Sequence, residues 1–341
     1  LLAVARVAQV QLPTDVISTD NPGLLRTIAV NPNAPVEIRL EAAERAEQAG
    51  ALPVDVLRQL YTSVSFSKED LANPLSKAEA ESGPLSRALL YRTSLVQTIP
   101  TAQAEAVARA LSLAREGGRY PATVSVFMPV LKSIPPTADL VWFAPEAIRA
   151  FLIAGDIKAA GDWFVIMRAT SLFNEDVKGE ISALYPISRL AGLDIGGGDG
   201  DGLARWWEAA RKLEGARDRA ALLYSLFEAI GEPVPGAAWD VLISGPERIT
   251  MAMPHPVLWR RLEDASKMSS RQGETGETGE GAVRPSRRAE TVLLALLALG
   301  EGGPGRAEPI VLRRVLRSLS GAGFKKESRA LALEAAVASG L

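Results

Sequence analysis

Three aspartates in the segment 194–202, which reads DIGGGDGDG, are the residues best suited to metal chemistry. Asp194, Asp199 and Asp201 could supply the carboxylate oxygens that Ca²⁺ prefers on a flexible loop. An EF-hand loop requires a bidentate Glu at its twelfth position, but that position, counted from Asp194, is Arg205. Calcium-binding nonapeptides occur in tandem, whereas this tract occurs once. We therefore interpret the segment as a solvated linker, with a metal site as the alternative.

The chain offers few residues for catalysis. It contains no Cys, which excludes disulfides, thiolate metal sites and Cys nucleophiles, and its one His excludes sites with several His ligands. This residue, His255, lies between Pro254 and Pro256, which rigidify a turn and would suit a positioned base. No Ser or Asp pattern points to it, so we interpret it as a histidine on a surface turn. We expect no enzymatic activity, and we assign no catalytic, cofactor-binding or metal residue.

A cluster of basic residues near the C-terminal end could bind an anionic partner. Its members are Arg313, Arg314, Arg317, Lys325, Lys326 and Arg329. Arg313 and Arg317 are four positions apart, which places both on one face of a helix. A solvated helix face is the favoured interpretation, and an acidic partner or an anionic headgroup is the functional alternative. Nucleic acid is not expected, because aromatic residues do not interleave with the basic ones and the formal net charge is −2.

The large aromatic residues are expected to anchor a hydrophobic core or to line a groove for a partner. The set comprises Trp142, Phe143, Trp163, Trp206, Trp207 and Trp259. Their positions on helical faces favour the core interpretation. If the chain binds another protein, the residues that we expect to contact it are Trp163, Trp206, Arg313 and Arg317.

Most of the sequence has the periodicity of amphipathic helices, and these helices must position the residues named above. Between Thr101 and Arg115, apolar residues recur every three or four positions, and two glycines follow where the helix should end. The same design recurs along the chain, for example at 144–153 and 325–338. The segment 122–130 is rich in Val and Thr like a strand, but no partner strand is visible. We predict that it is a buried helix kinked at Pro129.

The composition is that of a globular protein. Hydrophobic residues make up 47 % and charged residues 23 % of the 341 residues, which excludes a disordered chain and a polycation for nucleic acid. No apolar run approaches the roughly 18 residues of a membrane-spanning helix. We predict two helical-repeat arrays, 1–193 and 203–341, joined by the Gly/Asp linker 194–202, with a mobile loop at 268–285. The chain begins with Leu1, as expected for a processed chain or a piece of a longer protein.

The segment 144–170 contains two amphipathic helices around a tight turn and resembles a tetratricopeptide hairpin. Gly155 starts the turn, the small Ala160 follows five positions later, and the aromatic Phe164 follows after four more, as in that family. The family's Trp in the first helix and its closing Pro are absent, and similar glycine turns recur at irregular distances. The resemblance implies an all-α fold, an α-solenoid of stacked antiparallel helical hairpins with irregular repeats. It further implies a non-catalytic protein-binding or scaffolding module.

The C-terminal sequence, from ALLALGEGGP to ALEAAVASG, is similar to the ends of exported helical-repeat proteins of proteobacteria labelled "antifreeze glycopeptide-related". Ice binding is not expected, because the chain lacks Ala-Ala-Thr tracts. The resemblance implies a periplasmic protein of unassigned function, with the cytoplasm as the alternative, and we expect the chain to be part of a bacterial cell-envelope assembly. Two further functions stay open, an accessory arm of a peptidoglycan-acting enzyme and a peptide or small-ligand binder. The Glu81-Ser82 pair resembles that of lytic transglycosylases, but their Gly-Leu-Met-Gln stretch does not follow, so catalysis at Glu81 is not expected.

Overall fold

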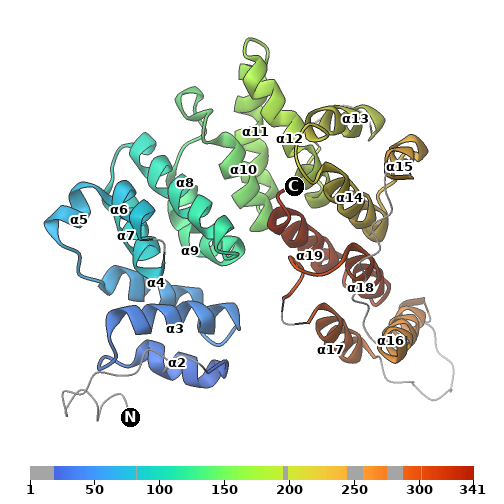
Figure 1. Cartoon of the computed structure of the whole chain (residues 1–341), viewed down its shortest axis with the longest axis horizontal. Coiled ribbons are helices and arrows are strands. Elements are labelled where there is room, and N and C mark those ends of the chain that lie inside the picture. The colour runs from blue at the N-terminus through green and yellow to red at the C-terminus, as the bar shows by residue number, and fades with distance from the viewer. Residues whose placement is uncertain (1–18, 82, 195–198, 244–255, 275–286, 301) are drawn as a thin grey trace. The chain divides into compact units, whose positions relative to one another are not determined.

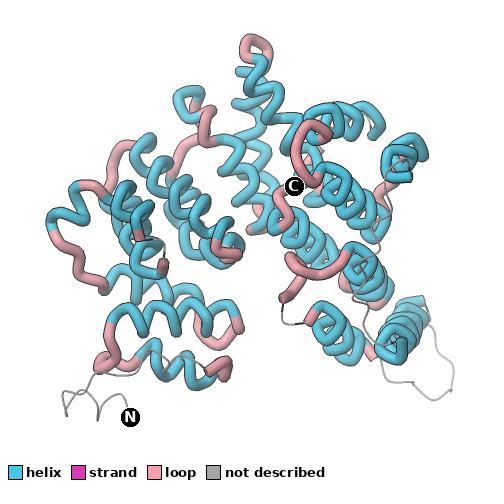
Figure 2. Tube along the Cα trace, viewed as in Figure 1, coloured by secondary structure: helices cyan, strands magenta, loops and turns pink. Residues whose placement is uncertain are grey.

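Every regular element that the structure describes is a helix. The computed structural model describes residues 19–81, 83–194, 199–243, 256–274, 287–300 and 302–341. Within these ranges no strand is formed, as the colours of Figure 2 show. The all-α prediction is therefore confirmed for this part of the chain. None of these helices combines the length and the hydrophobicity needed to span a bilayer.

The chain divides into two compact units, Leu1–Ala150 and Phe151–Leu341. The described helices of the first unit are α2 (Pro22–Val30), α3 (Val36–Gln48), α4 (Val54–Ser63), α5 (Lys68–Ala72), α6 (Pro74–Ala80), α7 (Pro84–Val96), α8 (Pro100–Glu116), α9 (Tyr120–Ser133) and the short 3₁₀ helix η2 (Ala138–Leu140). Neighbours in the chain pack together, α2 on α3, α7 on α8 and α8 on α9 (Figure 1). Helix α10 (Ala144–Ile153) contains the boundary between the units.

The second unit brings together helices that are far apart in the sequence. Its described helices are α11 (Ile157–Ser171), α12 (Glu175–Ala191), α13 (Asp199–Ala210), α14 (Ala216–Ile230), α15 (Gly236–Ile243), α16 (Pro256–Glu274), α17 (Arg288–Leu299), α18 (Pro309–Gly321) and α19 (Lys325–Ala338). Helix α18 packs against α14 as well as against α16 and α17, and α19 packs against α12 and α14. Helix α18 therefore lies between α14 and the α16–α17 pair, and α19 lies against α12 and α14. A row of hairpins that contact only their chain neighbours would not place them there.

The turn between α10 and α11 has the predicted local geometry. Gly155 has φ +75°, a backbone conformation that glycine adopts without steric cost. The side chain of Asp156 accepts a hydrogen bond from the Ala159 N–H at 3.2 Å and caps α11. Ala160 and Phe164 are both buried. The predicted order of helix, turn and helix is therefore confirmed for this segment, including the bounds of its first helix.

The segment 122–130 is helical and lies in α9, with Pro129 inside the helix. A proline has no N–H to donate to the carbonyl four residues earlier, which here belongs to Ser125. The guanidinium group of Arg58, on α4, donates to this Ser125 carbonyl and to the Val126 carbonyl at 2.9 Å. A side chain from another helix thus replaces the hydrogen bond that Pro129 removes.

The segment 194–202, predicted to be a linker, lies within the second unit, and its last four residues already belong to α13. The helix can start early because Gly202 is buried against the ring of Tyr185 on α12. A Cβ atom at Gly202 would lie only 2.0 Å from Cε2 of Tyr185. The glycine therefore allows α12 and α13 to approach closely, a role that the linker interpretation missed. Residues 195–198 lie outside the described residues.

The prediction of a loop at 268–285 is wrong for its first seven residues, which continue α16 to Glu274. Within this part of the helix, Ser269 is buried and its Oγ donates to the Ala265 carbonyl at 2.9 Å. The remainder of the predicted loop, 275–285, lies outside the described residues.

Candidate functional site

The two tryptophans expected to contact a partner are buried. Only 2 % of Trp163 and 5 % of Trp206 are exposed. Both indoles therefore act as core anchors, which is the interpretation that the sequence favoured for the large aromatic residues. Neither presents a surface to another molecule in this structure.

The two arginines expected to contact a partner lie side by side on α18, as the spacing predicted. Both donate to the same carboxylate oxygen, Oε1 of Glu228 on α14, Arg313 at 2.7 Å and Arg317 at 2.9 Å. The Arg313 and Arg317 side chains remain 37 % and 49 % exposed. A guanidinium group carries five N–H donors, so one shared oxygen leaves most of this donor capacity unused. The carboxylate thus orients the two arginines without saturating them.

The rest of the predicted basic cluster is divided between two other environments. Arg329 pairs with Glu232 at 2.7 Å and donates to the Leu190 carbonyl at 3.2 Å, so it joins α19 to the ends of α12 and α14. Lys325 and Lys326 are exposed in the first turn of α19. The six basic residues therefore do not form one continuous patch.

A groove lies beside Arg313 and Arg317, between α16 and α18. Its volume is about 480 Å³, and its lining residues are Glu263, Ser266, Lys267, Ile310, Arg313, Arg314, Arg317 and Ser318. A hydrophobic cluster holds the two helices that form its walls. Trp259 and Leu262 from α16 pack there with Val315 and Leu319 from α18 and with Ala295 from α17. The groove is therefore placed by the amphipathic pattern of three helices.

Small residues bring the two walls of the groove together. The Ser266 hydroxyl on α16 donates to the Ser318 carbonyl on α18 at 2.7 Å, and both residues are buried. A Cβ atom at Gly321 would lie 2.8 Å from Oγ of Ser266, so a larger residue there would press the helices apart. The floor of the groove is thus fixed by close backbone approach.

The groove carries a surplus of positive charge. Four of its lining residues are cationic and only Glu263 is acidic. The guanidinium carbon of Arg314 lies 5.3 Å from the ring centroid of Trp259, which holds this cation over an aromatic face. Nε of Arg313 is buried and has no hydrogen-bond partner among the described residues.

Sequence reasoning found the arginines of α18 but not the residues that surround them. Glu228 is 85 positions away from Arg313, and no local pattern connects the two. Three other lining residues lie on α16, namely Glu263, Ser266 and Lys267. No local sequence pattern indicates that α16 packs against α18. The one available signal was the apolar stripe of α16, which indicates a packed face without indicating its partner.

The remaining sequence candidates do not form a chemical site. Glu81 is exposed and pairs with Lys77 at 2.6 Å, and it lacks the desolvated environment of a general acid. Asp199 and Asp201 lie in α13 rather than on a loop, and His255 lies outside the described residues. In the described ranges, no group of three or more His, Asp or Glu side chains could hold a metal ion.

Comparisons of the chain with protein-family models, with curated proteins and with solved structures find no match. The resemblances to tetratricopeptide hairpins and to exported helical-repeat proteins therefore stay predictions.

Proposed function

We propose that this chain is a non-catalytic protein-binding module, and that the groove between α16 and α18 holds an acidic segment of a partner protein. The observation that carries the proposal is the excess of cationic side chains around a groove whose only acidic lining residue is Glu263. Arg313 and Arg317 are already oriented by Glu228, so little side-chain freedom would be lost when they bind a carboxylate.

An acidic peptide segment suits this groove better than a free ion does. Arginine forks bind carboxylates through two parallel hydrogen bonds, and the Arg313 and Arg317 side chains are 37 % and 49 % exposed. Ile310 lies at the groove and is partly exposed, so an apolar side chain next to the acidic residues would also find a contact. Charge and shape together favour an extended segment with glutamates or aspartates beside an apolar residue.

The wider role that we propose is scaffolding in a bacterial cell-envelope assembly, in the periplasm. It is supported by the packing of successive helices in the first unit and by the resemblance of the C-terminal sequence to exported proteins. The stacked, solenoid-like arrangement of hairpins belongs to this proposal, and in the second unit it would have to include the additional packing of α18 against α14. Small-angle scattering of the purified chain would distinguish an elongated particle from a globular one.

The groove can be tested by the binding of a fluorescent synthetic peptide rich in glutamate, with its glutamine counterpart as the uncharged control. We expect Arg314→Gln and Arg317→Gln each to weaken binding by about 2- to 5-fold, as is usual for a solvent-exposed ion pair. Binding should also weaken with added salt. Arg317→Gln leaves the Arg313–Glu228 pair in place, so this variant should fold normally.

The matched controls are Arg260→Gln and Arg261→Gln, which remove the same charge from exposed positions of α16 that do not line the groove. These controls should bind the glutamate peptide like the unmodified chain. Equal affinity of all four variants for the peptide, or equal affinity for the glutamine peptide, would contradict the proposal.

A further inference from the structure

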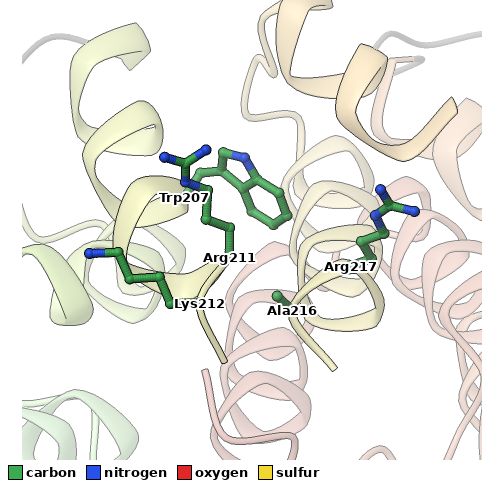
Figure 3. Close-up of a pocket in the computed structure, with 5 residues that line it drawn as sticks. All are labelled: Trp207, Arg211, Lys212, Ala216 and Arg217. Carbon is green, nitrogen blue, oxygen red and sulfur yellow. The ribbon is translucent and has the colours of Figure 1, made fainter. Parts of the chain in front are cut away.

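A second pocket lies in the same unit, between the end of α13 and the start of α14. Its volume is about 470 Å³, and it is lined by Trp207, Arg211, Lys212, Ala216 and Arg217 (Figure 3). Pockets for small ligands commonly range over roughly 300–1,000 Å³. This pocket has no residue in common with the groove between α16 and α18 and goes beyond the function proposed above.

The indole of Trp207 forms one wall of this pocket. Its neighbour Trp206 is buried, and the two ring centroids lie 6.4 Å apart. Consecutive helical residues point about 100° apart, so when Trp206 enters the core, Trp207 is turned toward the edge of the unit, where it is half-buried. In Figure 3 the indole lies between the side chains of Arg211 and Arg217, with its nitrogen toward the same side as their guanidinium groups. The wall therefore combines a flat apolar face with an N–H donor.

The charge around the pocket is positive. Three of the five lining residues are cationic and none is acidic. Glu208 pairs with Arg211 at 2.6 Å, but Lys212 and Arg217 form no ion pair with a described residue. The side chain of Lys212 extends away from the indole in Figure 3, so Arg217 is the cation best placed to contact a ligand on the ring.

We propose that this pocket binds a planar ring that carries a carboxylate or a phosphate group. The ring would stack on the indole of Trp207, and the anionic group would accept hydrogen bonds from Arg217 and Arg211. Exposed cations alone hold an anion weakly, because water and salt screen the charge. A neutral ring alone would gain only the stacking contact. The pocket supplies both contacts, so it selects ligands in which ring and anion are combined.

The test is a titration followed through the indole N–H signals in ¹H–¹⁵N spectra, with Trp207→Phe used to assign the Trp207 signal. The probes are benzoate and phenyl phosphate, which carry the ring with either anion, benzamide, which lacks the charge, and inorganic phosphate, which lacks the ring. We expect benzoate or phenyl phosphate to shift the Trp207 signal and to bind about tenfold more tightly than benzamide and inorganic phosphate. The better of the two identifies the anionic group.

Two variants test whether binding depends on this pocket or only on general attraction between charges. Arg217→Gln should weaken binding of the preferred probe by about tenfold. Arg205→Gln removes the same charge from an exposed position of α13 outside the pocket and should bind like the unmodified chain. Unchanged helical circular dichroism would show that each variant is folded.

Three results would overturn the proposal. Benzamide could bind as tightly as benzoate, which would reduce the pocket to an apolar surface. Inorganic phosphate could bind as tightly as phenyl phosphate, which would reduce it to a charged one. Arg205→Gln could weaken binding as much as Arg217→Gln does, which would show that the position of the charge does not matter.

Discussion

Arg87 and Glu44 form a two-pronged ion pair in the interior of the first unit. Nε of Arg87 donates to Oε1 of Glu44 at 2.8 Å and Nη2 donates to Oε2 at 2.6 Å, and both side chains are more than nine-tenths buried. The Tyr61 hydroxyl donates to Oε1 at 2.5 Å, and Arg119 approaches Oε2 at 3.2 Å. A single carboxylate on α3 therefore connects α4, α7 and the start of α9.

A similar arrangement recurs later in the same unit around Glu146. Its Oε2 accepts from Arg115 at 2.6 Å and its Oε1 accepts from the Tyr120 hydroxyl at 2.8 Å. The guanidinium carbon of Arg115 also lies 5.1 Å from the centroid of the Tyr120 ring. In both clusters one glutamate binds a buried tyrosine and an arginine from other helices. The first unit thus fixes its helices with charged groups as well as with apolar packing.

Replacement of Glu44 by Ala should destabilise the chain strongly. It would leave Arg87 buried without its counter-charge, and such a loss typically costs about 3–5 kcal/mol. The free energy of unfolding, measured by urea denaturation and circular dichroism, would show the change. Glu41→Ala is the matched control, because Glu41 lies on the same helix but is exposed, and its loss should change the stability by less than about 0.5 kcal/mol. Similar free energies for both variants would show that the pair does not hold α3 and α7 together.

Stability should fall in alkaline solution because of the two buried tyrosines. Burial, with the charge of the neighbouring glutamate, raises the pKa of Tyr61 and of Tyr120 well above the ordinary value near 10. Above about pH 10 the unfolded chain loses these protons while the folded chain keeps them, so the free energy of unfolding decreases as the pH rises. Below that pH the two side chains contribute no pH dependence.

The double variant Tyr61→Phe, Tyr120→Phe isolates this effect from the titration of lysines. Its free energy of unfolding, measured between about pH 8 and pH 11, should decline less steeply than that of the unmodified chain. The phenylalanines also remove two hydrogen bonds, so the variant should be less stable near neutral pH. Parallel pH profiles of the variant and the unmodified chain would exclude the tyrosines as the cause.

Arg58 and Pro129 should show coupled effects on stability. Arg58→Ala would remove the donor that satisfies the Ser125 carbonyl in α9, at an expected loss of about 1–3 kcal/mol. In a Pro129→Ala background, residue 129 regains an N–H that can bond this carbonyl, so the same arginine replacement should cost less. A double-mutant cycle by urea denaturation measures the difference. Additive effects would mean that Arg58 does not compensate for the proline.

The helices could be predicted well from local sequence patterns, because a helix depends mainly on residues that are close together in the sequence. The bounds of α10 and α19 agree with the sequence prediction, and the turn after α10 follows from Gly155 and Asp156 alone. The groove between α16 and α18 could be predicted only in part. The spacing of Arg313 and Arg317 gave one face of one helix, but the packing of α14 on α18 that brings Glu228 to them depends on apolar contacts across the whole unit.

Gly202 on α13 lies so close to the ring of Tyr185 on α12 that a larger residue should destabilise the chain. Gly202→Ala would bring a methyl group to 2.0 Å from Cε2 of Tyr185, so α13 would have to move away from α12. Overpacking of this kind typically destabilises by about 1–3 kcal/mol. Gly179→Ala on α12 is the matched control, because nothing lies within 4 Å of its added Cβ, and it should raise the stability by about 0.5–1 kcal/mol through the better helix propensity of alanine. The two free energies of unfolding should therefore change in opposite directions. If both glycine replacements stabilise the chain, the ring of Tyr185 does not constrain the position of α13.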